Sequence, residues 1–220
     1  MAQFLQASPG AERTKGESSM EKTAKEERVR KLAQAALFAA LAYIGFQFFR
    51  IDIPVAGDKT AFHLGNTFVV LGALFLGNPW GGLAGAVGLT IADLTSGYVT
   101  SAPKTFFLKL MIGLIAGLVA HKALHLDQVT DGKKRLWITL LASVCALGFN
   151  VVADPIVGYF YKQYILGQPQ DIAKALAKIS ALTTFVNAVA STACAVVFYN
   201  AIYPALKRSH LLADSGEKRS

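Results

Sequence analysis

TIADLTSGYVTSAPKTFFLK, residues 90–109, runs out of one apolar segment, turns, and enters the next. The stretch carries Asp93, Lys104 and Lys109 between two hydrophobic flanks that are rich in glycine. Placing an ionisable side chain at membrane depth is costly, so such residues are by default candidates for a functional role. We therefore interpret this stretch as a membrane hairpin around which the rest of the chain is organised.

The composition outside this hairpin is that of an integral membrane protein. Of the 220 residues, 53% are hydrophobic and only 16% are charged, which is too apolar for an ordinary soluble domain. A formal charge of +8 would suggest nucleic acid, but the basic residues lie in a polar N-terminal tail and in short loops, without interleaved aromatic residues. We expect no nucleic-acid partner, because the enrichment of Lys and Arg on the cytoplasmic side of membrane proteins explains the charge better.

Hydropathy predicts an all-α fold, an integral membrane bundle of six transmembrane helices in the lipid bilayer. Pro54 cannot continue the first span, and Pro103 suits the first turn of the fourth. A polar loop, VAGDKTAF, is expected between the first two spans. The predicted spans are residues 31–49, 63–77, 80–98, 103–124, 136–161 and 181–203.

The predicted bundle domain covers residues 29–208. It lies between a disordered N-terminal tail, residues 1–28, and a C-terminal tail, residues 209–220. Fifteen Lys and Arg residues lie before residue 32, in the loop 122–135 and after Tyr203, against six on the opposite side. This bias predicts a multi-pass protein of the cell (plasma) membrane with both termini in the cytoplasm, and it places the turn at residues 96–104 outside.

Strongly polar residues gather in the outer halves of the predicted spans, whereas the inner halves are nearly pure Ala, Val, Leu, Ile and Gly. An outward-facing, water-accessible pocket for a small polar ligand explains this asymmetry. Tyr98, Phe106, Phe107, Tyr159 and Phe160 are predicted as aromatic walls of this pocket. The predicted substrate-binding residues are His63, Asn66, Asp93, Tyr98, Lys109, Asn150, Asp154 and Asn187.

Structural explanations of the same residues stay open. His63, Asn66 and Lys104 lie where polar side chains can cap helices or reach the interface. Asp93 and Lys109 could form an internal ion pair, which would also be compatible with a pocket between them.

The first span carries small residues on a broad face, Ala35, Ala36, Ala39 and Ala40. Such faces let helices approach closely. On this span the face is interpreted either as internal packing or as a docking surface for another membrane protein. The paired glycines of the third and fourth spans, Gly81 with Gly85 and Gly113 with Gly117, are expected to pack internally.

No enzyme motif competes with a transport or binding role. The sequence has no HExxH, no GxSxG, no Walker lysine motif and no cluster of Cys and His. Cys145 and Cys194 both lie inside apolar segments, where they are expected to pack as small side chains. We therefore expect no enzyme activity, no cofactor and no metal, and any active transport needs energy from a partner or an ion gradient.

Three stretches resemble the substrate-binding S components of energy-coupling factor (ECF) vitamin transporters. They are KLAQAALFAALAYIGF (31–46), FHLGNTFVVLGALFLGNPWGGLAGAVGLTIADLTSGY (62–98) and APKTFFLKLMIGLIAGLVA (102–120). The resemblance covers about residues 29–208. It implies a six-helix subunit with cytoplasmic termini that captures a B-type vitamin or precursor at its outer face.

The resemblance also implies partners. Ala35, Ala36, Ala39 and Ala40 would dock on a transmembrane coupling subunit, which acts with two cytoplasmic ATPase subunits. The most similar members are those assigned to pyridoxine, hydroxymethylpyrimidine or riboflavin. The stretch KISALTTFVNAV, residues 178–189, departs from the Pro-Asn type of pattern expected in those members.

The alternative from another class is a stand-alone secondary carrier driven by protons through Asp93 and Asp154. Carriers often have two halves related by an inverted repeat, and spans one to three show no such correspondence with spans four to six. A third interpretation is a membrane assembly protein without a ligand, in which the buried charges are purely structural.

Overall fold

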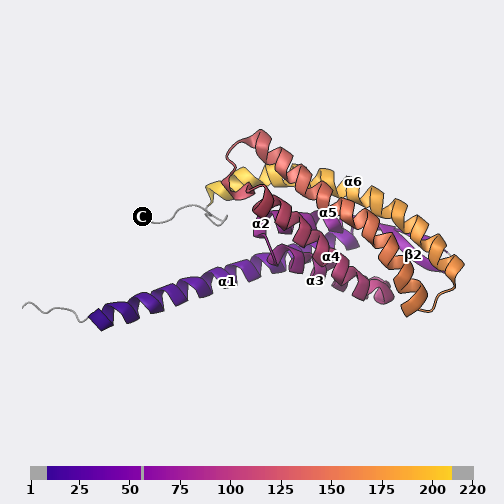
Figure 1. Ribbon diagram of the computed structural model, residues 1–220, viewed down its shortest axis with the longest axis horizontal. Helices are drawn as coiled ribbons and strands as arrows, with labels where there is room; N and C mark the ends of the chain where they lie inside the picture. The colour runs from indigo at the N-terminus through magenta and orange to yellow at the C-terminus, as the bar shows by residue number, and fades with distance from the viewer. Residues whose placement is uncertain (1–8, 56, 210–220) are drawn as a thin grey trace, which may run out of the picture.

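The computed structural model describes residues 9–55 and 57–209, with side chains from residue 20 onward. Residues 1–8 of the predicted N-terminal tail and residues 210–220 of the predicted C-terminal tail lie outside this part of the chain. Figure 1 shows the helices of the bundle side by side, with α1 extending beyond it. The elements are α1 (Pro9–Gln47), β1 (Ile51–Val55), β2 (Asp58–Phe62), α2 (Gly65–Leu76), α3 (Trp80–Thr95), η1 (Val99–Ser101), α4 (Ala102–Gly117), η2 (Leu118–Ala123), η3 (Leu126–Gln128), α5 (Gly132–Phe160), η4 (Tyr161–Ile165) and α6 (Gln170–Arg208).

Four helical segments are long and apolar enough to cross a membrane, namely Met20–Gln47, Val99–Ala123, Gly132–Ile165 and Gln170–Arg208. By contrast, α2 has 12 residues and α3 has 16. At 1.5 Å per residue they reach only about 18 and 24 Å, less than the roughly 30 Å of a hydrocarbon core. The structure therefore supports a helical membrane protein, while six complete crossings stay a prediction.

Glycines bring the central helices into close contact, as predicted for the third and fourth spans. A Cβ on Gly81 would lie 2.3 Å from the Cα of Ala73 in α2, and a Cβ on Gly113 would lie 2.2 Å from the Cα of Gly82. Both distances are far below any van der Waals contact, so only glycine permits this helix separation. The predicted internal packing of these glycines is confirmed.

Within the described residues the fold is all-α apart from the first connection, where a strand pair replaces the polar loop predicted at residues 55–62. β1 and β2 pair antiparallel, with Ile51 opposite Phe62 and Val55 opposite Asp58. Alternating branched residues at 51, 53 and 55 favour a strand, and Pro54 is tolerated because a two-stranded sheet consists of edge strands. Gly57, with a φ of 82°, supplies the left-handed residue of the tight turn.

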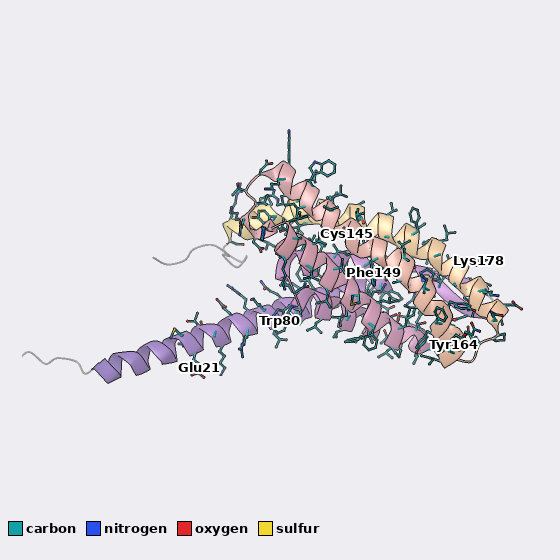
Figure 2. All side chains as sticks on the ribbon, viewed as in Figure 1. Glu21, Trp80, Cys145, Phe149, Tyr164 and Lys178 are labelled. Atoms are coloured by element: carbon teal, nitrogen blue, oxygen red, sulfur yellow. The ribbon has the colours of Figure 1, made fainter. Side chains whose placement is uncertain are left out.

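The N-terminal part of the chain also differs from the sequence prediction. Residues 9–28, predicted to be disordered, form the first part of α1, and Figure 2 shows Glu21 on this extension. Acidic residues precede basic ones by four positions at residues 21 and 25, 26 and 30, and 27 and 31. Such pairs stabilise an exposed helix, which explains why a polar sequence continues the span without a break.

The connections divide the bundle into two ends. We call one the hairpin end, where β1–β2, the α3–α4 connection and the α5–α6 connection meet, and the other the opposite end, where α6 ends and from which α1 extends (Figure 1). At the hairpin end the Nζ of Lys59 donates to the Ser96 carbonyl at 2.9 Å. At the opposite end the Nε of Arg135 donates to Oδ1 of Asn200 at 3.1 Å. The start of α1 and the end of α6 thus lie on the same side of the bundle (Figure 1).

Candidate functional site

A cavity of about 100 Å³ lies near the hairpin end, between β2 and the helices of the bundle. All eight predicted substrate-binding residues line it, although they come from segments up to 124 positions apart in the sequence. The fold therefore brings the eight predicted residues together around one cavity. The eight are His63, Asn66, Asp93, Tyr98, Lys109, Asn150, Asp154 and Asn187.

The aromatic lining differs from the prediction. Phe106, Phe107, Tyr159 and Phe160 do not line the cavity, and Phe107 is 66% exposed. The helix explains this, because Thr105 and Lys109, four positions apart, face inward and leave the two phenylalanines on other faces. Of the predicted aromatic walls only Tyr98 lines the cavity, and it is joined by Phe46, whose ring meets that of Tyr98 edge to face at 5.8 Å.

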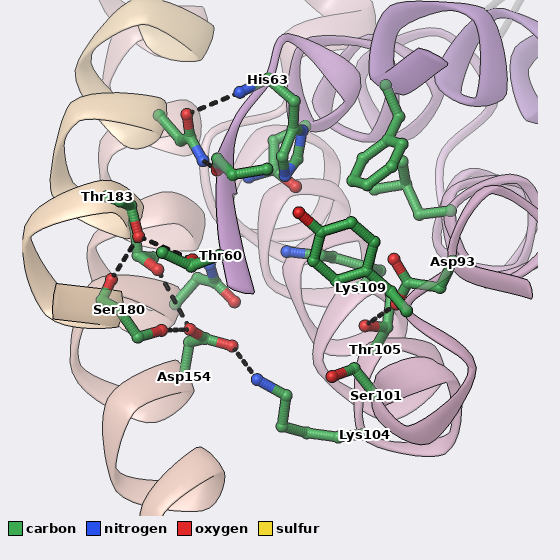
Figure 3. Close-up of a pocket in the computed structure, with 18 of the residues that line it drawn as sticks. Thr60, His63, Asp93, Ser101, Lys104, Thr105, Lys109, Asp154, Ser180 and Thr183 are labelled. Carbon is green, nitrogen blue, oxygen red and sulfur yellow. Dashed lines mark hydrogen bonds and ion pairs between the residues drawn. The ribbon is translucent and has the colours of Figure 1, made fainter. Parts of the chain in front are cut away.

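Asp154 joins three helices beside the cavity. Its Oδ1 accepts from the Nζ of Lys104 at 2.7 Å. Its Oδ2 accepts from the hydroxyls of Ser180 at 2.5 Å and Thr184 at 3.0 Å, as Figure 3 shows for the first of these. Because both oxygens are engaged, this carboxylate holds α4, α5 and α6 together, and a direct contact with a ligand would compete with these bonds.

Asn187 fastens the end of β2 to α6. Its Oδ1 accepts from the backbone N–H of His63 at 3.0 Å, and its Nδ2 donates to the carbonyl of Ala61 at 3.0 Å. One turn earlier, Thr183 lies 3.1 Å from Thr60, hydroxyl to hydroxyl. Sequence reasoning placed Asn187 at the site but could not show that its amide serves the backbone.

The hairpin covers the cavity through a second set of contacts. The hydroxyl of Tyr98 donates to Oδ1 of Asp52 at 2.7 Å, and the Nζ of Lys59 lies 4.3 Å from the centre of the Tyr98 ring. Asp58, at the tip of the hairpin, forms an ion pair with Lys162 of η4. Burial alone would raise the pKa of Asp58, but the hydrogen bond and charge of Lys162 outweigh it, and the pKa is lowered.

Asp93 and Lys109 face the cavity without pairing with each other. Oδ2 of Asp93 accepts from the Thr105 hydroxyl at 2.5 Å. Within the described part of the chain, Lys109 makes no hydrogen bond and no ion pair, although only 8% of it is exposed. Figure 3 shows its amine reaching into the cavity. The internal ion pair that the sequence left open is therefore not formed.

Two buried amides also lack partners. Asn66 and Asn150 are each 1% exposed, and neither Oδ1 has a hydrogen-bond partner among the described residues. A buried polar atom without a partner is costly. His63 adds a donor, because its Nδ1 accepts from the Gly65 N–H at 3.2 Å and the neutral ring then carries its proton on Nε2. These groups can bind a small polar molecule.

Sequence reasoning missed several residues that line the cavity. Lys59, Thr60 and Lys162 come from the hairpin and from η4, whose folding was not predicted, and Phe46 gave no signal because aromatic residues are common at the ends of spans. Thr105 could have been found, since it lies one helical turn before Lys109. The described residues hold no group of three or more His, Cys, Asp or Glu suited to a metal ion.

The predicted docking face of α1 divides between two environments. Ala35 is buried, and the carbonyl of Ala39 lies so close to Gly88 that a Cβ there would be 2.2 Å away. Ala36 and Ala40 are exposed. Internal packing therefore explains two of the four alanines, and only the other two are free to contact a partner.

Comparison with known proteins gives one family match. A family model described as "ECF-type riboflavin transporter, S component" matches residues 26–204. No curated protein and no solved structure matches the chain. S components are subunits of transporters and not enzymes, so the prediction of a non-enzymatic membrane transport protein is confirmed. The match does not favour the proton-driven carrier.

Proposed function

The chain belongs to the family of ECF-type riboflavin transporter S components, and we propose that it is the substrate-binding subunit of an ATP-driven vitamin importer. It captures a B-type vitamin or precursor at the outer face of the plasma membrane. Among the pyridoxine, hydroxymethylpyrimidine and riboflavin classes, riboflavin is the first to test, because the family description names it.

The observation that supports this proposal best is the polar cavity near the hairpin end. Lys109, Asn66 and Asn150 line it, and all three are buried. Neither the amine of Lys109 nor the Oδ1 of either asparagine has a hydrogen-bond partner among the described residues. Inside a membrane protein such groups are costly unless a ligand or water satisfies them. A bound heterocycle with several polar atoms would satisfy them together.

In this proposal the cavity residues have two roles. Lys109, Asn66, Asn150, Asp93 and His63 contact the ligand, because each has a polar group that faces the cavity or lacks a partner. Tyr98, Asp154 and Asn187 also line the ligand site and give it shape, since their hydrogen bonds hold the hairpin and three helices in place.

The proposal includes the orientation and the partners. The hairpin end faces outward, both termini are cytoplasmic, and the short helices α2 and α3 complete six crossings. Ala36 and Ala40 on the exposed side of α1 contact a transmembrane coupling subunit, which acts with two cytoplasmic ATPase subunits. Small side chains there allow the backbones of two helices to approach closely.

Two experiments test this function. Mass spectrometry of purified protein should identify a bound vitamin, and calorimetry should give saturable binding for riboflavin, pyridoxine or hydroxymethylpyrimidine. Failure of every compound in both assays would reject a substrate-binding subunit. In liposomes, uptake should require the coupling module and ATP, whereas uptake by this chain alone, driven by a proton gradient, would support the carrier instead.

A further inference from the structure

Most of the charged side chains around the cavity are paired with an opposite charge, but two are not. Three of the four lysines that line it each have a carboxylate within ion-pair distance, although Asp52, the partner of Lys59, is shared with Arg50, which lies 2.9 Å from it. The pairs are Lys104 with Asp154 at 2.7 Å, Lys59 with Asp52 at 3.6 Å, and Lys162 with Asp58.

The two charged groups that remain are Lys109 and Asp93. Lys109 has no hydrogen-bond or ion-pair partner among the described residues. Asp93 is 5% exposed and uses Oδ2 for Thr105, while Oδ1 has no hydrogen-bond partner in the described part of the chain. The cavity thus presents one cationic donor and one anionic acceptor, separated from each other and of equal and opposite charge.

We propose that these two residues together recognise one edge of an uncharged heterocycle, on which an N–H group lies next to a C=O group. The N–H donates to Asp93 and the C=O accepts from Lys109. This inference rests on the proposed function, since it describes the ligand of the same cavity. A ligand with a net charge at this edge would neutralise one residue and leave the other buried without compensation, which is strongly unfavourable.

The neighbouring amides fit such a ligand. Asn66 and Asn150 each have an unpartnered Oδ1, which can accept a hydrogen bond, and each amide also carries donors. A heterocycle with alternating N–H and C=O groups would satisfy both kinds of site. A purely anionic ligand would supply acceptors only and would leave these carbonyl oxygens unpaired.

The test uses riboflavin, whose ring has an imide N–H between two carbonyls, and its derivative methylated at that nitrogen. For the wild-type protein, methylation should weaken binding roughly 10- to 100-fold, the range of a hydrogen bond to a charged group. This comparison needs no variant, so it stands even where a substitution prevents folding. Equal binding of the two compounds would overturn the inference.

Variants then assign the contact to residues. In Asp93→Leu the two flavins should bind within about threefold of each other, because the acceptor that discriminates between them is gone. An unchanged penalty for methylation in this variant would show that another group accepts the N–H. Asp171→Leu is the matched control, since Asp171 is exposed at the start of α6, and it should keep the full discrimination.

Lys109→Met should weaken riboflavin binding at least tenfold, whereas Lys178→Met should not, because Lys178 is exposed on α6 (Figure 2). Equal effects of the two lysine substitutions would contradict the role of Lys109. The proposed function and this inference fail in different ways. Absence of any vitamin ligand rejects both. Riboflavin binding that tolerates methylation, or a bound vitamin that is charged at this edge or lacks an N–H next to a C=O, such as pyridoxine or hydroxymethylpyrimidine, rejects only the recognition by Asp93 and Lys109.

Discussion

The ion pair between Lys104 and Asp154 gives the most quantitative prediction for the stability of the bundle. The side chains are 12% and 13% exposed, and the two charged atoms are 2.7 Å apart. Ser180 and Thr184 donate to the other oxygen of Asp154. Replacing Asp154 by Ala would remove three hydrogen bonds and leave the ammonium of Lys104 buried without its partner.

The expected cost follows from this geometry. Removing one member of a buried ion pair typically destabilises a protein by about 3–5 kcal/mol, because an uncompensated charge remains. The lost bonds from Ser180 and Thr184 belong to the same network, so their energies are not simply added. We therefore expect Asp154→Ala to lower the free energy of unfolding by about 3–5 kcal/mol.

The assay is thermal or denaturant unfolding of the purified protein in one fixed detergent. Asp171→Ala is the control, because Asp171 is exposed and its loss should change the unfolding free energy by less than about 0.5 kcal/mol. The double substitution Lys104→Met with Asp154→Leu should cost less than Asp154→Ala alone, since no buried charge remains. A loss below about 1 kcal/mol for Asp154→Ala would refute the reasoning that this pair is buried and structural.

Three further predictions concern packing, docking and pH. Gly88→Leu should abolish the folded state, because its Cβ would lie 2.2 Å from the Ala39 carbonyl oxygen. Gly148→Ala should be tolerated, because a Cβ at that position has no other atom within 4 Å. Size-exclusion chromatography distinguishes a folded from an aggregated variant. Ala36→Trp should keep vitamin binding and lose ATP-dependent uptake with the coupling module, and loss of binding as well would mean that this face packs internally. The pKa of Asp58 is lowered in the folded protein, so its ion pair stabilises the fold above about pH 4, and this contribution is lost as the pH falls through the folded-state pKa. The difference in unfolding temperature between wild type and Asp58→Asn should therefore shrink in acid. A difference that stays constant with pH would contradict this assignment.

The sequence was sufficient to bring the cavity residues together. Asp93, Lys109, Asn150 and Asp154 are conspicuous because polar groups are rare in apolar spans, and a rise of 1.5 Å per residue places them at similar depth. Depth along the membrane can thus be read from residue number alone. For this reason, residues that lie on separate helices could be assigned to one site from the sequence.

The partners of these residues could not be predicted, because they depend on how each helix is rotated about its axis. Lys104 pairs with Asp154, whereas Lys109, about one and a half turns further along α4, stays unpaired. For the same reason the sequence could not show which alanines of α1 are buried, since a small side chain suits both the internal contact at Ala39 and the exposed face at Ala40. Helix rotation is set by the packing of the whole bundle.

The hairpin was missed for a different reason. Its strands have only five residues each, which is too short for the alternation of Ile51 and Ile53 to stand out against Pro54 and the charged residues around it. Its contacts with Tyr98 and Lys162 join segments far apart in the sequence. Such long-range contacts leave no local pattern.

The most direct test of a vitamin-binding cavity is a calorimetric titration of the purified chain with riboflavin, pyridoxine and hydroxymethylpyrimidine. We expect one-to-one, saturable binding of one compound, and a loss of that binding in Lys109→Met while Lys178→Met retains it. No heat of binding with any of the three, from protein that is folded and free of bound ligand, would contradict the assignment.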